Sequence, residues 1–213
     1  MTITLDGTLG ITSPAPSVLQ GSTSGSVTLT VPAVAGSNTI TLPAGTGTAA
    51  VQGVSTNIVS GTAVASTSGT SIDFTGIPSY AKRITVMFSG VSTNGTSPPQ
   101  LQIGSGSVTT SGYLGQNSIL TSAPITTTFT TGFGIGVNSS NWAAFVVVNG
   151  AITLKLLSGN TWVADGILGR SDASGSYFTA GSIALSGTLD RVRITTVNGT
   201  DTFDAGSVNI LWE

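Results

Sequence analysis

The stretch that decides the fold runs from Phe145 to Leu156 and reads Phe145-Val-Val-Val-Asn-Gly-Ala-Ile-Thr-Leu-Lys-Leu156. β-Branched and aliphatic residues dominate both halves, and these residues pack well on a pleated sheet. The Asn149-Gly150 pair between the halves tolerates the positive φ angles of a type I′ turn better than other residue pairs. The stretch therefore predicts a β-hairpin whose two strands meet at Asn149-Gly150.

Alternation of apolar and polar residues recurs on both sides of this stretch, with the period of two that is typical of half-buried strands. Gly or Pro interrupts every candidate helical stripe. Two further Asn-Gly pairs, at Asn94 and Asn198, indicate chain turns. We predict an all-β fold. The alternating segments are Ile3/Leu5, Val27/Leu29/Val31, Ile40/Leu42, Ile84/Val86/Phe88, Leu101/Ile103, Val192/Ile194 and Val208–Trp212.

The composition limits the classes of function. The 213 residues are 39% hydrophobic and 7% charged, with a formal net charge of -2, which does not fit intrinsic disorder. Six dispersed cations are too few to neutralise a run of phosphates, so nucleic-acid binding is not expected. The apolar runs are far shorter than the roughly 20 residues that span a bilayer, and no secretion signal is visible. We expect a protein made in the cytoplasm and not inserted in a membrane.

The chain lacks residue types on which many enzyme mechanisms depend. The chain has no histidine and no cysteine, which excludes Ser-His-Asp and Cys-His nucleophiles and zinc sites that need those ligands. The aspartates leave open a carboxylate pair for glycoside hydrolysis, and Asp201 with Asp204 leaves open a calcium site. The preferred interpretation is that these carboxylates cap turns. We predict no catalytic residue, no metal site and no cofactor.

Two features indicate close packing or ligand contact. Gly132-Phe-Gly-Ile-Gly136 lacks the spacing of a phosphate loop, so its alternate glycines predict close packing of one strand face against another sheet or subunit. Aromatic rings near polar loops can stack on sugars, with Asp172 as a neighbouring hydrogen-bonding group; the alternative is that these rings fill the core. The predicted ligand contacts are Tyr113, Trp142, Trp162, Asp172 and Tyr177.

The segment from Gly7 to Ile72 carries no charged and no aromatic side chain, and only sixteen of its residues are Val, Ile, Leu or Phe. Ordering it costs about 1.5 kcal/mol per residue, which needs more apolar burial than these side chains supply within one chain. A change in composition near residue 60 predicts two domains. Residues 1–60 are expected to intertwine with sister subunits or dock on an assembly, and residues 61–213 are expected to form a β-sandwich.

Both ends of the second domain resemble a module of tailed-bacteriophage tail fibres and other virion proteins. The likeness is strongest over residues 60–96 and 186–213 and less distinctive from about residue 98 to 182. The first domain also looks like the attachment regions of phage fibres. The segments that carry the resemblance include Ser71-Ile-Asp-Phe-Thr-Gly-Ile-Pro78, Lys82-Arg-Ile-Thr-Val-Met-Phe-Ser-Gly-Val-Ser-Thr-Asn-Gly-Thr96 and Ser186-Gly-Thr-Leu-Asp-Arg-Val-Arg-Ile-Thr-Thr-Val-Asn-Gly-Thr200.

The resemblance implies a non-enzymatic structural protein located in the virion. The expected form is a homotrimeric tail fibre that attaches to other virion proteins through residues 1–60. Its jelly-roll-like outer domain is expected to contact a glycan or protein of the host surface. One alternative is a head fibre or capsid-decorating protein, and a weaker one is a polysaccharide-degrading tailspike.

Overall fold

The computed structural model describes residues 17–20, 26–29, 58–137 and 140–213. The chain divides into two units, Met1–Ala50 and Val51–Glu213, which are described separately. In the first, β1 (Ser17–Gln20) pairs with β2 (Ser26–Leu29) in antiparallel fashion, in agreement with the alternation predicted around Val27. The alternating segments at residues 3–5 and 40–42, and most of the predicted attachment domain, lie outside the described residues.

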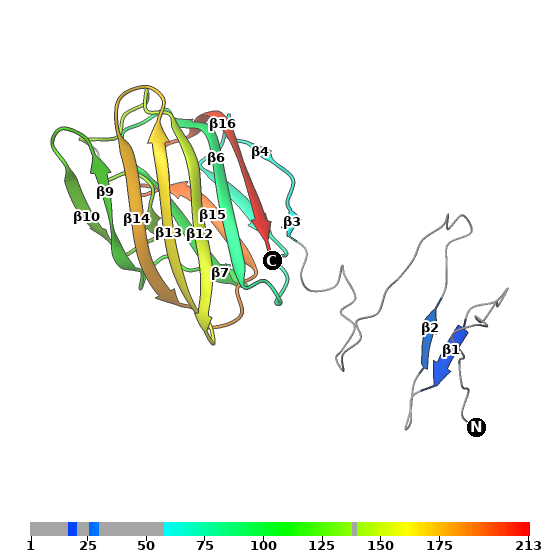
Figure 1. Cartoon of the computed structure of the whole chain (residues 1–213). Coiled ribbons are helices and arrows are strands. Elements are labelled where there is room, and N and C mark those ends of the chain that lie inside the picture. The colour runs from blue at the N-terminus through cyan, green and yellow to red at the C-terminus, as the bar shows by residue number, and fades with distance from the viewer. Residues whose placement is uncertain (1–16, 21–25, 30–57, 138–139) are drawn as a thin grey trace. The chain divides into compact units, whose positions relative to one another are not determined.

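The second unit contains two antiparallel sheets (Figure 1). The larger sheet runs in the order β10 (Ile125–Phe129), β9 (Leu114–Leu120), β14 (Ser176–Ala184), β13 (Thr161–Arg170), β12 (Val148–Ser158), β6 (Arg83–Thr93), β16 (Phe203–Trp212) and β3 (Val59–Ser60), with β4 (Val64–Ala65) also paired to β16. The smaller sheet runs in the order β11 (Phe133–Gly134), β7 (Pro99–Ser105), β15 (Arg191–Thr196) and β5 (Ser71–Thr75), with β8 (Ser107–Val108) paired to β7.

The described residues contain no helix, so the all-β prediction is confirmed, and the two sheets are consistent with the expected β-sandwich. In Figure 1, β15 and β7 lie behind the broad face of the larger sheet. The jelly-roll connectivity, the trimer and the domain boundary near residue 60 stay predictions.

The core lies between the two sheets and follows from the predicted alternation. On β7, Leu101 and Ile103 are completely buried, and on β15 Val192 and Ile194 are as well. On the larger sheet Ile84, Val86 and Phe88 of β6 face the same core. Each such side chain contributes about 1.5–3 kcal/mol through burial, so the alternating strands hold the two sheets together.

The hairpin predicted at Asn149-Gly150 is wrong. Both residues lie inside β12, at a shift in its register against β6, and the hairpin that joins β12 to β13 turns at Gly159-Asn160 instead. Gly159 has a φ of 54°, and glycine at the first position of a two-residue turn is typical of type II′.

Tertiary contacts explain why the Asn-Gly pair does not turn the chain. The Asn149 side chain accepts a hydrogen bond from the backbone N–H of Gly90 on β6, at 2.7 Å. A Cβ atom on Gly150 would lie 2.3 Å from the carbonyl oxygen of Ile167 on β13, so this position needs glycine in a strand that is paired on both sides. The local preference for a turn is thus overridden by an irregular strand position.

The other two Asn-Gly pairs connect the sheets. The return predicted at Asn198-Gly199 is confirmed: the Gly199 N–H donates to the carbonyl oxygen of Thr196, and the chain crosses there from β15 to β16. Asn94 follows β6, and its side chain accepts from the Thr202 N–H at 2.9 Å. No non-glycine residue in the described ranges has a positive φ, so none of the three pairs forms the expected type I′ turn.

Two facing glycines interrupt the pairing of β6 with β16. The register shifts on both sides of Ala205, and Gly90 and Gly206 have φ values of 65° and 88°. A Cβ atom on Gly206 would lie 2.4 Å from the carbonyl carbon and oxygen of Gly90. A bulge of this kind bends a strand and increases its twist, and here only glycine fits the backbone contact.

Candidate functional site

The four aromatic residues predicted to contact a ligand lie in the core. Tyr113, Trp142, Trp162 and Tyr177 are 0%, 1%, 3% and 1% exposed. The rings of Trp142 and Tyr177 lie 5.9 Å apart, whereas Tyr113 packs edge-on against Phe133 at 5.0 Å. No ring face is therefore presented to solvent for stacking on a sugar. The burial supports the alternative left open by the sequence, in which these rings fill the core.

The polar atoms of three of these residues are hydrogen-bonded inside the protein. The Trp142 indole N–H donates to the hydroxyl of Thr93 at 2.8 Å, and the Tyr177 hydroxyl donates to the carbonyl oxygen of Asn141 at 2.7 Å. The Tyr113 hydroxyl accepts from the Ile103 N–H at 2.8 Å. Hydrogen bonding of this kind removes the cost of burying a polar group, so all three rings are well suited to an interior position.

Burial raises the pKa values of Tyr113 and Tyr177 from 10.0 to about 12 each. The folded state therefore holds both protons more tightly than the unfolded state, and this contribution to stability is complete below pH 10. We expect it to be lost as the pH rises from 10 to about 12, so that phenolate absorbance and loss of circular dichroism develop together. Ionisation of Tyr113 and Tyr177 near pH 10 in a chain that keeps its β-sheet spectrum would contradict the burial.

Asp172, the fifth predicted contact, binds groups of its own chain, Arg170 and the Val147 backbone. Its carboxylate forms an ion pair with Arg170 and accepts from the Val147 N–H at 3.0 Å. Burial acts to raise the pKa of Asp172, but the hydrogen bonds from Arg170 and the backbone outweigh it, so the pKa lies below its ordinary value. The carboxylate is thus ionised at neutral pH and is engaged with groups of its own chain.

Most of the remaining charged side chains also bind groups of their own chain. Four further ion pairs join cations to carboxylates. Counted with the Arg170–Asp172 pair, they involve five of the six lysine and arginine residues. Asp201 accepts from the Ser97 N–H at 2.8 Å and thereby caps a turn. The part of the chain that the structure describes holds no cluster of three acidic side chains that could bind a metal ion. The further ion pairs are Arg83–Glu213, Lys155–Asp165, Arg191–Asp190 and Arg193–Asp73.

The glycine-rich stretch packs closely, as predicted. A Cβ atom on Gly134 would lie 2.5 Å from the amide nitrogen of Asn117 on the larger sheet, and one on Gly136 would lie 2.6 Å from the Trp142 ring. Asn117 also donates a hydrogen bond to the carbonyl oxygen of Gly136. The bare glycines thus let the end of the smaller sheet approach β9.

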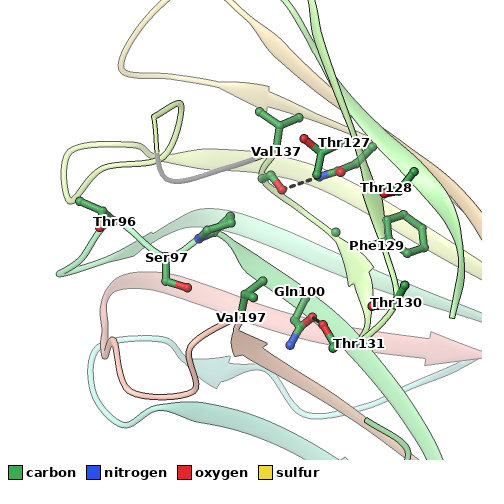
Figure 2. A pocket seen from close by; sticks show the side chains of 14 residues that line it. Thr96, Ser97, Gln100, Thr127, Thr128, Phe129, Thr130, Thr131, Val137 and Val197 are labelled. Carbon is green, nitrogen blue, oxygen red and sulfur yellow. Dashed lines mark hydrogen bonds between the residues drawn. The ribbon is translucent and has the colours of Figure 1, made fainter. Parts of the chain in front are cut away.

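A hollow of about 500 Å³ opens beside this contact (Figure 2). Figure 2 shows Thr127–Thr130 on one side of the space and Thr96 and Ser97 on the other, with Val197, Gln100 and Thr131 along one end. β10 contributes one wall and ends the larger sheet among the described strands. We call this space the first hollow; its lining residues are Thr96, Ser97, Pro98, Gln100, Asn117, Thr127, Thr128, Phe129, Thr130, Thr131, Gly134, Gly136, Val137 and Val197.

The first hollow offers hydroxyl and amide groups beside apolar surface, and none of its lining residues is charged. Pro98, Phe129, Val137 and Val197 supply the apolar part. A volume in this range is typical of small-molecule sites, which combine apolar walls with a few fixed polar groups. The hollow can therefore hold an uncharged polar ligand by hydrogen bonds and contact with C–H groups.

A second hollow of about 350 Å³ adjoins the first. The two share Gln100, Thr131 and Val197, so they meet at these residues, and we call the two hollows together the groove. The second hollow lies over the outer side of β7 and β15. Its further lining residues are Thr70, Ser71, Gln102, Thr110, Arg193, Thr195, Thr196, Asn198 and Gly199.

Sequence reasoning did not identify the groove residues. The available signals were the threonine run around Phe129 and the two glutamines that alternate with Leu101 and Ile103 on β7. Because Leu101 and Ile103 face the core, Gln100 and Gln102 must lie on the opposite face of the smaller sheet.

Comparison with known proteins finds no matching family model, no matching curated protein and no matching solved structure. No helix that could cross a membrane occurs among the described residues.

Proposed function

We propose that the chain is a non-enzymatic structural protein of a tailed-bacteriophage particle, a trimeric fibre whose β-sandwich is displayed outward and contacts the host surface. The proposal begins from the resemblance of residues 60–96 and 186–213 to virion appendage proteins. Residues 1–60 would attach the chain to other virion proteins, in keeping with their lack of charge and aromatic side chains.

One structural observation carries the proposal. The two segments of the resemblance, about 100 residues apart, pair with each other in both sheets: β16 pairs with β3, β4 and β6, and β15 pairs with β5. They thus build a common framework at one side of each sheet. The less distinctive middle supplies β7–β14 and most of the first hollow, whereas most of the second hollow comes from the two segments of the resemblance.

Imaging of intact particles that carry a tagged copy of the full chain tests the location. Density at the tail or baseplate is the expected result. Density on the capsid lattice would instead favour the head-fibre or capsid-decorating role.

Sedimentation of the purified chain tests the trimer, and a single-subunit mass would refute it. Saturable binding of the full chain to host cells tests the contact with the host surface.

A further inference from the structure

We propose that the two adjoining hollows form a binding groove for an extended, uncharged glycan. The proposal deepens the proposed function, on which it rests, by naming the class of ligand and the residues that hold it. The groove is the proposed ligand surface, and the buried Trp142 ring packs against Gly136 in the lining of the first hollow.

Two glutamines of the groove, Gln100 at the junction of the hollows and Gln102 in the second hollow, are fixed in place while each keeps one polar end free. Gln100 and Gln102 are 4% and 5% exposed. Both are held by Thr131: its hydroxyl donates to the Gln100 amide oxygen at 2.8 Å, and its carbonyl oxygen accepts from the Gln102 amide nitrogen at 2.8 Å. Gly132 leaves room for this arrangement, since a Cβ atom there would lie 2.8 Å from the Gln100 amide oxygen.

The free ends are a donor and an acceptor. Within the described part of the chain, the Gln100 amide nitrogen and the Gln102 amide oxygen make no hydrogen bond, and neither is sealed from solvent. Figure 2 shows the Gln100 oxygen turned toward Thr131 and the nitrogen turned away from it. Buried polar side chains are normally satisfied, so a preorganised donor and acceptor that face a groove indicate a hydrogen-bonding ligand.

The first hollow has no charged lining residue, which favours an uncharged ligand. An anion or cation that enters it would lose hydration without gaining an opposite charge, which is unfavourable. In the second hollow the one charged side chain, Arg193, is engaged with Asp73 at 2.6 Å. A sugar hydroxyl both donates and accepts, and so matches an amide nitrogen, an amide oxygen and threonine hydroxyls equally well.

The elements that line the groove favour a chain of sugars over a peptide strand. A peptide could pair with the outer edge of β10, but β10 lines only the first hollow. A ligand that occupies both hollows must leave that edge and cross Gln100 and Val197 on the outside of the smaller sheet. Val197 is 54% exposed at the junction, where its methyl groups can contact the apolar face of a sugar ring.

The test uses the full chain and a matched pair of variants. Val197→Arg places a long charged side chain at the junction of both hollows, and Leu157→Arg makes the same kind of change at a 69% exposed position that lines neither hollow. The probes are immobilised neutral and acidic oligosaccharides of increasing length. We expect saturable binding to neutral chains, with affinity rising with length, reduced on the order of tenfold or more by Val197→Arg and unchanged by Leu157→Arg.

Gln100→Glu provides a second variant that keeps an oxygen for the Thr131 hydroxyl, removes the free donor and brings charge into the first hollow. It should also lose binding to neutral glycans, with its thermal unfolding measured alongside. Equal binding by the Val197→Arg variant, preference for acidic oligosaccharides, or no binding to any neutral chain would overturn the glycan groove.

Treatment of host cells separates this proposal from the proposed function. Periodate oxidation of cell-surface sugars should abolish binding of the full chain, whereas protease treatment should not. Binding that survives periodate and is lost after protease treatment would overturn the groove while leaving host attachment in place. Binding to neutral oligosaccharides without any binding to host cells would leave the groove and refute the receptor role.

Discussion

Replacement of Trp142 by alanine is expected to lower the free energy of unfolding by about 3–5 kcal/mol, the range for deletion of a buried aromatic side chain. The indole is 1% exposed, packs against Tyr177 and donates to the Thr93 hydroxyl. The substitution therefore creates a cavity beside Gly136 and leaves Thr93 without its buried donor. Urea unfolding followed by circular dichroism measures the loss.

Phe145→Ala is the control for this variant. Phe145 lies three residues away but is 68% exposed, so its truncation should change the free energy of unfolding by no more than about 0.5 kcal/mol. If Trp142→Ala were as mild as Phe145→Ala, the tryptophan would not be a core residue and its role in ligand contact would have to be reconsidered.

Gly206→Ala should be the most damaging of the small substitutions. A non-glycine residue at the positive φ of 88° costs about 1–3 kcal/mol, and the new methyl group would also meet the Gly90 backbone at 2.4 Å. The strand pairs on both sides of this contact, Ala205 with Ser92 and Ser207 with Ser89, hold the two backbones close together. We expect a loss of more than about 2 kcal/mol in the free energy of unfolding, measured by urea denaturation.

Gly199→Ala separates the two causes. Gly199 has a φ of 70°, but a Cβ atom there would have no neighbour within 4 Å. The free energy of unfolding that Gly199→Ala loses should therefore reflect the backbone conformation alone. This loss should be clearly smaller than the loss caused by Gly206→Ala. Equal losses in the two variants would show that crowding at the facing glycines does not constrain the fold.

The strands were predictable because their signal is local. Alternation at Ile84/Val86/Phe88 and at Leu101/Ile103 reflects one buried and one outer face, and this pattern is independent of the partner strand. The hairpin at Asn149-Gly150 failed because two neighbouring strands, not the local turn preference, decide the conformation of those residues.

The candidate site was not predictable because it depends on contacts between residues that are distant in the sequence. Trp142 and Tyr177 stand next to polar residues in the sequence, but burial depends on contacts with distant strands. The groove is assembled at Gln100 from the 96–98 connection, β10 and the turn after β15, which are brought together only by the packing of the two sheets.

The paired charges have a consequence for how this domain meets a partner. With five of its six cations held by its own carboxylates, the described surface generates little long-range electrostatic field to guide an approaching molecule. Its encounters should proceed at the unsteered rate of about 10⁵–10⁶ M⁻¹s⁻¹ and be insensitive to ionic strength. In the trimeric fibre proposed above, durable attachment would then depend on simultaneous engagement of several copies, whose combined residence time exceeds that of any single contact.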